Sequence, residues 1–539
     1  MTATTERRTG RHEARPVGSP WTATADLLRF AVRRDRIRLG IWIVALTSLM
    51  FYTPSALKLA YPDEAQRLAR VELLKTPAGM IMGGPMFGRN ETDLGAMMAN
   101  EMMLTLIVAT SILAILTVIR HTRAEEESGA AELVMSSVVG RYARTAAALL
   151  LVAAVNLTLA LSMTLAMAST GFRIADTAAM CLGVTAVAMV FGAVAAVTAQ
   201  LWRQARAATG AAMATLAVAA LVRGVGDVID HSGSLLSWFS PIAWAQQMRA
   251  FVDLTWWPLA LLPALTVALV TLAAVLESRR QYDDGTIPST GEHQKARAIN
   301  GVLALHLTLQ RGQIIGWAVG LFLGGLAFGS MTQSLLDAAP GNEMIQRVIA
   351  AQGIDSVHTT MTQFLAAAAS AYVVAAVLRV YGDEDKGLGE PVLAGSVSRW
   401  RWLWTAVGSA VLASVVLMLC AGLGNGLGAG ISLGQPDTVA RLTVAGLAYL
   451  PALAVMAAVA AVAVALRRPW IGWLMVTFVV AALYLGALLR LPQWLIDLSP
   501  VGRTTVPMDY PITAMIVMVV VAAALALVAG ALYRRRDVG

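Results

Sequence analysis

Long apolar runs separated by short polar segments dominate this chain. Twelve of these runs have about 18 residues or more, the length that a helix needs to span a bilayer. They form two sets of six. We expect membrane-spanning helices near 39–60, 98–120, 145–170, 177–201, 207–224 and 257–276, and again near 312–332, 362–380, 402–430, 440–466, 470–490 and 511–533.

The composition agrees with this pattern, because 57% of the 539 residues are hydrophobic and 14% are charged. A soluble chain carries about a quarter charged residues. The predicted fold class is therefore an all-α polytopic membrane protein with twelve transmembrane helices. The excess of Lys and Arg (41 against 33 Asp and Glu) marks cytoplasmic loops rather than a nucleic-acid surface, since no separate basic domain is present. The basic clusters place both termini in the cytoplasm.

The chain also repeats itself. The segment AEEESGAAELVMSSVVGR (124–141) aligns without a gap with GDEDKGLGEPVLAGSVSR (382–399). A six-span unit duplicated in tandem keeps its orientation, so we expect two parallel six-helix repeats, a fused pseudo-dimer. The predicted organisation is a disordered cytosolic tail (1–20), a first six-helix half (21–280), a cytosolic linker (281–294) and a second half (295–539). Each half begins with a predicted amphipathic interfacial helix, near 21–37 and 295–312.

In both copies the repeated acidic segment follows the second span of its half. We call these segments the first elbow (residues 120–141) and the second elbow (residues 378–399). The second span is expected to continue beyond Arg120 and to end at Gly129, which can adopt the left-handed conformation of a helix C-terminus. A short amphipathic helix then runs from Ala131 to Gly140. In the second copy Pro391 suits the first turn of such a helix.

A solvated acidic loop is the alternative reading for either elbow taken alone. Two copies matched residue for residue favour a shared role, because drift erases such a match unless both copies meet the same kind of surface. A symmetric dimer offers two identical surfaces.

The elbows in their six-span halves resemble those of ATP-binding-cassette (ABC) permeases of the type-2 exporter class. More closely, EEESGAAELVMSSVVGR, SPIAWAQQMRAF (Ser240–Phe251) and WWPL (Trp256–Leu259) are similar to actinobacterial exporters of polyketide antibiotics of the tetronasin-resistance type. The resemblance covers nearly the whole chain from about residue 20. It implies a permease subunit of an ATP-driven exporter of hydrophobic or amphipathic drugs in the bacterial plasma membrane, with a re-entrant pair of short outer helices after the fifth span.

The resemblance also implies which residues transmit force from an ATPase. They are the acids and flanking arginines of the elbows: Glu125, Glu126, Glu127, Glu132 and Arg141 in the first, and Asp383, Glu384, Asp385, Glu390 and Arg399 in the second. The second elbow departs from the family's acidic run, with Lys386 where Ser128 stands and Pro391 in the helix. The second elbow is therefore expected to bind its partner differently from the first elbow.

No phosphate-binding loop is expected in this chain. None of its lysines (Lys58, Lys75, Lys295 and Lys386) lies in a G-x-x-x-x-G-K-[ST] context, which the phosphates of ATP require. ATP hydrolysis is therefore expected on a separate subunit, a homodimer that binds both elbows and carries ATP and Mg²⁺. This chain has no predicted catalytic residue, metal site or bound cofactor; its two cysteines lie inside apolar runs.

The methionine-rich start of the second span is the predicted substrate pathway, with Met98, Asn100, Glu101 and Met102. An ionisable group at membrane depth is a functional hypothesis by default, and methionines form adaptable surfaces for varied ligands. Glu101 would then favour cationic substrates. The alternative places Glu101 at the membrane interface, paired with Arg89.

Charged residues at the outer ends of the fifth and eleventh spans have a structural interpretation. We expect them to form ion pairs that brace the re-entrant hairpin: Arg223, Asp227, Asp230, His231, Arg490 and Asp497. The outer segments 61–97 and 333–361 are expected to form caps of short helices.

Three other functions compete with drug export by an ABC permease. The same architecture could export an endogenous lipid or polyketide. A proton-coupled transporter of the major-facilitator kind needs a basic loop after the second span and charges deep in the spans, whereas here that loop begins acidic and such charges are scarce. A membrane-embedded glycosyl- or acyltransferase needs a fixed acidic or histidine cluster in the first loop, where Asp63, Glu64, Glu91 and Asp93 are poor candidates.

Overall fold

The computed structural model describes residues 19–75, 77–87, 92–129, 138–280, 301–338, 353–385, 387–485 and 492–535. Within these ranges the chain forms helices and turns and no β-strand. Eleven helices in the described part of the chain are long and apolar enough to cross a membrane. The protein is therefore an all-helical, multi-pass membrane protein. Its described residues divide into two units, one from within residues 1–67 and 79–294 and the other from within 68–78 and 295–539.

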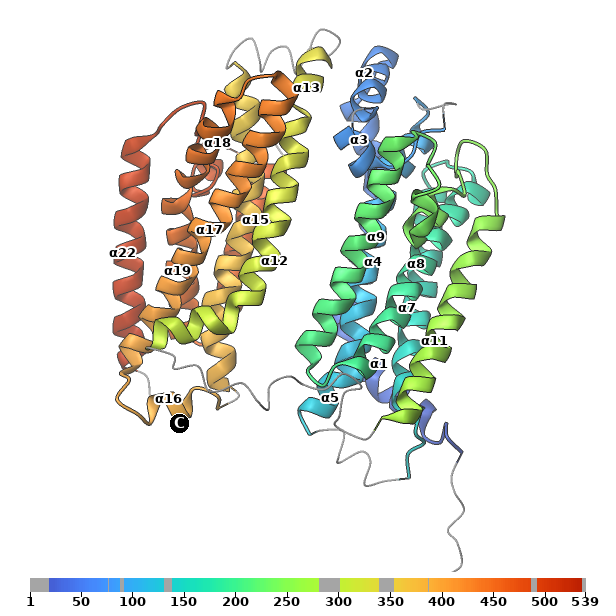
Figure 1. The fold of residues 1–539 in the computed structure, drawn as a ribbon, viewed down its shortest axis with the longest axis horizontal. Helices are drawn as coiled ribbons and strands as arrows, with labels where there is room; N and C mark the ends of the chain where they lie inside the picture. Colours follow the sequence, from blue (N-terminus) through green and yellow to red (C-terminus); the bar gives the residue numbers. More distant parts are fainter. Residues whose placement is uncertain are drawn as a thin grey trace, which may run out of the picture. The chain divides into compact units, whose positions relative to one another are not determined.

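Six long helices build the first unit (Figure 1). They are α1 (Thr24–Ala60), α4 (Leu94–His121), α7 (Ala143–Ala168), α8 (Ile174–Leu201), α9 (Ala205–Ile229) and α11 (Leu261–Arg279). Short helices connect them: α2 (Glu64–Leu74), α3 (Pro77–Gly83), α5 (Arg123–Glu127), η1 (Ser237–Phe239), α10 (Pro241–Gln246) and η2 (Trp257–Ala260). The segment after α9 thus forms the short helices that the resemblance implied.

The second unit repeats this order. Its long elements are α12 (Val302–Ser330), α15 (Ile354–Asp385), α17 (Arg399–Leu433), the pair α18 (Asp437–Leu447) and α19 (Leu450–Ala465), α20 (Trp470–Leu485) and α22 (Ile512–Arg534). Its short helices are α13 (Thr332–Ala338), α16 (Glu390–Leu393) and α21 (Gln493–Ile496). The same helix pairs pack in both units: α1 on α7 as α12 on α17, α4 on α8 as α15 on α19, and α8 on α11 as α19 on α22.

Three details differ from the pattern expected from hydrophobicity. The amphipathic segment near 21–37 is not a separate helix, because α1 runs without a break from Thr24 to Ala60. The span near 440–466 is two helices, which meet between Leu447 and Leu450. The span predicted near 470–490 is α20, and the last residues of the predicted range, 486–490, lie outside the described residues. The amphipathic segment near 295–312 is not a separate helix either, since its described part is the start of α12, which runs without a break from Val302 to Ser330; that start crosses the lower end of its unit in Figure 1.

Glycines set the distance between α12 and α17 in the second unit. A Cβ added to Gly329 would lie 2.1 Å from the carbonyl oxygen of Asn425, and one added to Gly424 would lie 2.1 Å from that of Phe322. Small residues let helix backbones approach closely, which is how helices associate where lipid removes the hydrophobic driving force. In the first unit α7 contains no glycine, so side chains fill the corresponding contact.

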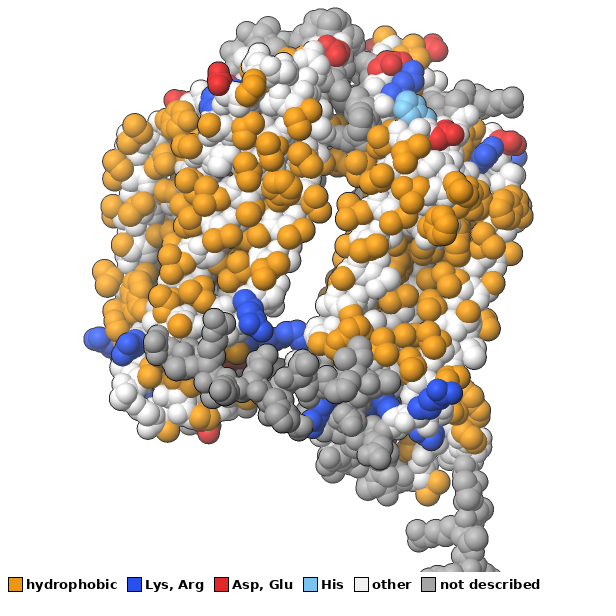
Figure 2. Space-filling model, in the orientation of Figure 1, with side chains coloured by type: hydrophobic (Ala, Val, Ile, Leu, Met, Phe, Trp, Pro, Cys, Tyr) orange, Lys and Arg blue, Asp and Glu red, His pale blue; other side chains and the backbone are white. Residues whose placement is uncertain are grey.

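The surface agrees with a position in a bilayer. On the face shown in Figure 2, hydrophobic side chains cover the middle of each unit, and Lys, Arg, Asp and Glu side chains gather near the helix ends. Exposed apolar side chains on the long helices, such as Ile41, Leu157 and Val520, are each more than half accessible. Lipid chains cover such side chains at no cost.

Candidate functional site

The first elbow ends at the glycine that its sequence predicts, but the helix before that glycine is broken, which the sequence did not predict. The helix α4 ends at His121, a break at Thr122 separates it from α5, and α5 ends at Glu127. Gly129 has a φ of +73°, which confirms the left-handed conformation expected there. Its N–H donates to the carbonyl of Glu126 at 3.0 Å. Residues 130–137, with Glu132 and most of the predicted second helix, lie outside the described residues.

Glu126 is the centre of the first elbow. Its carboxylate is almost completely buried and accepts hydrogen bonds from three guanidinium groups, those of Arg123, Arg144 and Arg280. Arg280 binds both carboxylate oxygens, at 2.7 and 2.9 Å. Such bidentate pairs are the strongest and most directional ion pairs in proteins. Glu126 therefore holds its own unit together, and its carboxylate is not on the surface.

The partners of Glu126 extend the network to further helix ends. Arg123 donates through Nε to the carbonyl of Arg203, which follows α8, at 2.5 Å. Arg280 donates through Nε to Gln200 of α8 at 2.6 Å. Glu127 accepts the N–H of Ala205, at the start of α9, at 2.9 Å, where an acid also complements the helix dipole.

The elbow is tied to α1 through a second cluster. Glu125 accepts from Arg34 at 2.7 Å. The buried carboxylate of Asp35 lies 3.0 Å from His121 Nε2 and 3.2 Å from Arg120. With the contacts of Glu126 and Glu127, the first elbow is linked to all six long helices of its unit. It continues α4, bonds to the ends of α7, α8, α9 and α11, and bonds to α1 at Arg34 and Asp35, within that helix.

Arg141 closes the elbow at its other end. Its guanidinium donates to the carbonyls of Glu277 and Ser278, in the last turn of α11, at 2.8 and 2.5 Å. It also donates to the carbonyl of Arg280, just beyond α11, at 3.4 Å. Gly140 lies against the backbone at the start of the described chain, where a Cβ would be 2.2 Å from the carbonyl oxygen of Pro20. Only glycine fits such an approach.

The second elbow repeats the bend with different side-chain partners. Gly387 has a φ of +68° and its N–H donates to the carbonyl of Glu384 at 3.0 Å, as Gly129 does to Glu126. The helix α16 begins with Glu390 and Pro391, which confirms the predicted helix start. Glu384, however, accepts from the hydroxyl of Tyr533 in α22, and Asp383 pairs with Arg379 one turn earlier at 3.5 Å. Asp385 and Glu390 are exposed, and Arg399 is half-buried as the first residue of α17.

Sequence reasoning found the acids of the first elbow but not their partners. Arg144, Gln200 and Arg280 were overlooked, and basic residues at the helix ends were used only as markers of topology. Every predicted span has a polar or charged residue at one of its ends. A search for contacts among these end residues could have found Arg144, Gln200 and Arg280.

Comparison with known proteins identifies the family. Residues 299–534 match the family described as the C-terminal domain of the multidrug efflux system permease Rv1217c. The multidrug efflux system permease protein Rv1217c of Mycobacterium tuberculosis (strain ATCC 25618 / H37Rv) is 34% identical to this chain over 546 aligned residues, which cover 98% of this chain and 97% of that protein. The chain belongs to this family of multidrug efflux permeases.

The residues predicted for the substrate pathway of this permease lie at the start of α4. Met98 is completely buried in the apolar core of the first unit. Asn100 is buried beside a small cavity that Met103 and Gln246 also line. Glu101 is half-buried, and Met102 accepts a hydrogen bond from Thr53 at 3.7 Å. A substrate role for these residues stays a prediction; Arg89 lies outside the described residues.

Charged residues in the last turns of α9 brace the short helices, as expected. Arg223 pairs with Asp227 at 3.2 Å and donates to the carbonyls of Met80 and Ile81 of α3. Asp227 accepts from Ser237 of η1 at 2.7 Å. In the second unit Asp497 pairs with Arg503 at 2.8 Å, and Arg490 lies outside the described residues.

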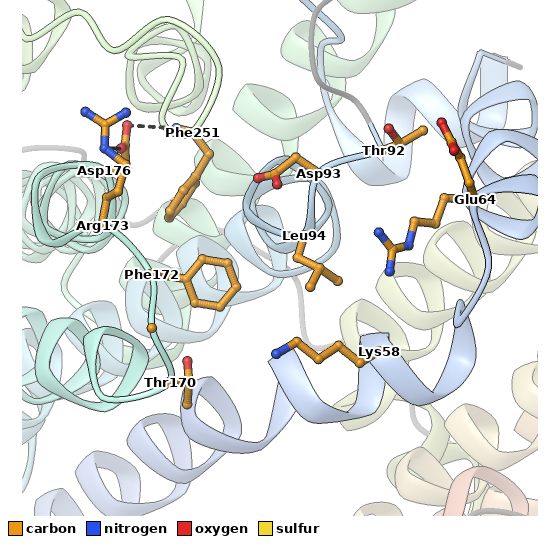
Figure 3. Close-up of a pocket in the computed structure, with 12 residues that line it drawn as sticks. Lys58, Glu64, Thr92, Asp93, Leu94, Thr170, Phe172, Arg173, Asp176 and Phe251 are labelled. Carbon is orange, nitrogen blue, oxygen red and sulfur yellow. Dashed lines mark hydrogen bonds and ion pairs between the residues drawn. The ribbon is translucent and has the colours of Figure 1, made fainter.

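A cavity of about 750 Å³ lies at the opposite end of α4 from the elbow (Figure 3). Lys58 points into it, toward Phe172. Phe172 and Phe251 form an edge-to-face pair at 5.7 Å. The wall is braced by Asp176, which accepts the N–H of Phe251 at 3.0 Å and pairs with Arg173 at 3.4 Å. Sequence reasoning did not single out this cavity, because its lining comes from four separate connections.

Proposed function

We propose that this permease is the transmembrane subunit of a type-2 ABC exporter that removes hydrophobic or amphipathic drugs from the cell. The first elbow carries the proposal. It is linked to all six long helices of its unit, so that a push on one short segment is passed to every helix. A separate homodimeric ATPase, with its own ATP and Mg²⁺, supplies that push. The plasma-membrane location, the cytoplasmic termini and the parallel pseudo-dimer belong to the same proposal.

Apolar side chains on the elbows support a protein partner. Val138 on the first elbow and Leu388 on the second are 76% and 62% exposed. Both lie beyond the apolar spans, at the charged helix ends, where lipid chains do not cover them. An apolar side chain at such a position is suited to the desolvated centre of a protein interface.

The elbow acids then divide into two roles. Glu126 is buried and Glu125 faces Arg34, so both hold the elbow in place and act through it. The exposed acids, Asp385 and Glu390, are available for contact with basic side chains of the ATPase. Glu132 stays a predicted contact.

Co-purification of the ATPase tests the docking part of the proposal. The double variant Val138→Asp, Leu388→Asp puts a charge in the interface centre, which costs more than the roughly 1–3 kcal/mol of an unpaired neutral polar group. We expect the amount of bound ATPase to fall at least about tenfold and drug resistance to fall with it. The matched control is Leu235→Asp, an equally exposed apolar residue at the opposite end of the unit.

The same preparation separates the rival functions. Drug-stimulated ATP hydrolysis by the complex supports the proposal. Unchanged ATPase binding in the double variant would contradict docking at the elbows. Drug transport that follows a proton gradient and needs no ATPase would instead identify a secondary transporter.

A further inference from the structure

A lateral groove in the first unit lies between helices that sequence reasoning assigned no role. Both α7 and α11 pack against α8 (Figure 1), and a cavity of about 390 Å³ opens where the three meet. Its lining includes Leu157 of α7, Leu182 of α8 and Val267 of α11. These side chains are substantially exposed, so the groove faces the lipid. Its volume falls within the range of small-molecule sites.

Asn156 is the polar side chain of this groove that lacks a hydrogen bond. It is 6% exposed, its amide nitrogen is buried without a partner, and no hydrogen bond to its side chain forms among the described residues. The two threonines of the lining differ, since Thr185 donates to the carbonyl of Cys181 at 3.0 Å and Thr266 to that of Leu262 at 2.9 Å. A polar group left unpaired in hydrocarbon is costly and points to a function.

The depth of Asn156 decides what can satisfy it. It lies near the middle of α7 (Ala143–Ala168), roughly 20 Å from either end at a rise of about 1.5 Å per residue. The hydrocarbon core of a bilayer is about 30 Å thick, so lipid ester groups and water stay near its edges. Acyl chains reach Asn156 but offer no hydrogen bond. An apolar molecule that carries its own carbonyl, ether or hydroxyl group fills the groove and also pairs with the amide.

The second unit provides the contrast. The residue aligned with Asn156 is Ser414 of α17, which is buried and donates to the carbonyl of Val411 one turn earlier at 2.7 Å. A serine hydroxyl satisfied by its own helix offers no donor to a ligand. At this pair of aligned positions, only the residue of the first unit has an unpaired amide.

We propose that the groove between α7, α8 and α11 binds the exported molecule directly from the lipid, and that Asn156 recognises a hydrogen-bonding group on an otherwise apolar substrate. This inference rests on the proposed drug export and names the substrate class and where it is taken up. On this proposal the first unit is the one that takes up the substrate.

Photolabelling of the purified permease in nanodiscs tests this site without any need for transport. The probe is an alkyl benzophenone, an apolar ketone that reacts with nearby C–H bonds, and the labelled residues are mapped by mass spectrometry. We expect labelling concentrated at Leu157, Leu182 and Val267. Asn156→Leu, which keeps the branched shape and removes the hydrogen-bonding atoms, should reduce labelling of these residues roughly three- to tenfold, the effect of one buried hydrogen bond.

Three further variants and a second probe complete the test. Leu157→Trp, which fills the groove, should abolish this labelling, while the controls Leu161→Trp, on the lipid face of the same helix, and Ser414→Ala should not change it. A hydrocarbon diazirine without a hydrogen-bonding group should label Asn156→Leu and the unmodified permease alike. Benzophenone labelling that is spread evenly over the lipid face, or that Asn156→Leu leaves unchanged, overturns the proposal in favour of an acyl chain. Drug resistance that persists in that case shows that export stands and only the groove is wrong.

Discussion

The two elbows have the same backbone and different electrostatics. In both, a glycine with positive φ donates to the carbonyl of a glutamate three residues earlier. In the first elbow that glutamate is surrounded by three arginines, whereas in the second it meets a tyrosine. The residues aligned with Arg123 and Arg144 are Tyr381 and Trp402. Duplication thus preserved the bend, and the contacts that bind it to the helices diverged.

A second contrast lies inside the units. The helices α12 and α17 meet backbone to backbone through glycines, while side chains separate α1 and α7. The first unit is therefore held at its elbow end by charge, and the second along its helices by close packing. We expect the two halves of the transporter to respond differently to the same perturbation.

Removing the buried carboxylate should have the largest effect. In Glu126→Ala three arginines lose their shared partner, and breaking a buried ion pair from one side costs about 3–5 kcal/mol. The aligned variant Glu384→Ala loses a hydrogen bond to a charged group, which costs about 1.5–3 kcal/mol. The free energy of unfolding, from SDS titration in mixed micelles, measures both. Equal losses in the two variants would contradict the contrast between the elbows.

Filling a glycine contact should come next. Gly329→Ala places a Cβ against the backbone of Asn425, and such overpacking costs typically about 1–3 kcal/mol. Gly320→Ala, on the same helix, meets nothing within 4 Å and should be neutral or slightly stabilising, because alanine is the better helix former. SDS titration in mixed micelles measures the free energy of unfolding of both variants. A neutral Gly329→Ala would mean that α12 and α17 do not need their close contact.

The smallest effect is expected at the third of the three consecutive acids in each elbow, Glu127 and Asp385. Glu127→Ala removes the carboxylate that accepts the first N–H of α9, and loss of such a cap costs about 0.5–2 kcal/mol. The aligned Asp385 is exposed at the end of α15, and Asp385→Ala should leave stability unchanged. If Asp385→Ala were the more destabilising of the two, the second elbow would have internal contacts comparable to those of the first.

The linear sequence was sufficient for features that depend on near neighbours. Apolar length predicted the long helices because lipid leaves the backbone no other way to satisfy its hydrogen bonds. The duplicated glycines predicted both bends, since a positive φ is a property of one residue and its next few neighbours. The break between Leu447 and Leu450 was missed because it lies inside a continuous apolar run. The break at Thr122 was missed because the charged residues around it include no glycine or proline to mark a helix end.

Only the tertiary structure decided what the elbow acids do. Glu126 meets Arg144 and Arg280 across 18 and 154 residues of sequence, and no periodicity connects positions so far apart. The same holds for the groove at Asn156, whose walls come from three helices. Burial and the choice of partner are properties of packing. A run of charges that reads as a solvated or docking surface therefore became an internal brace once six helices met around it.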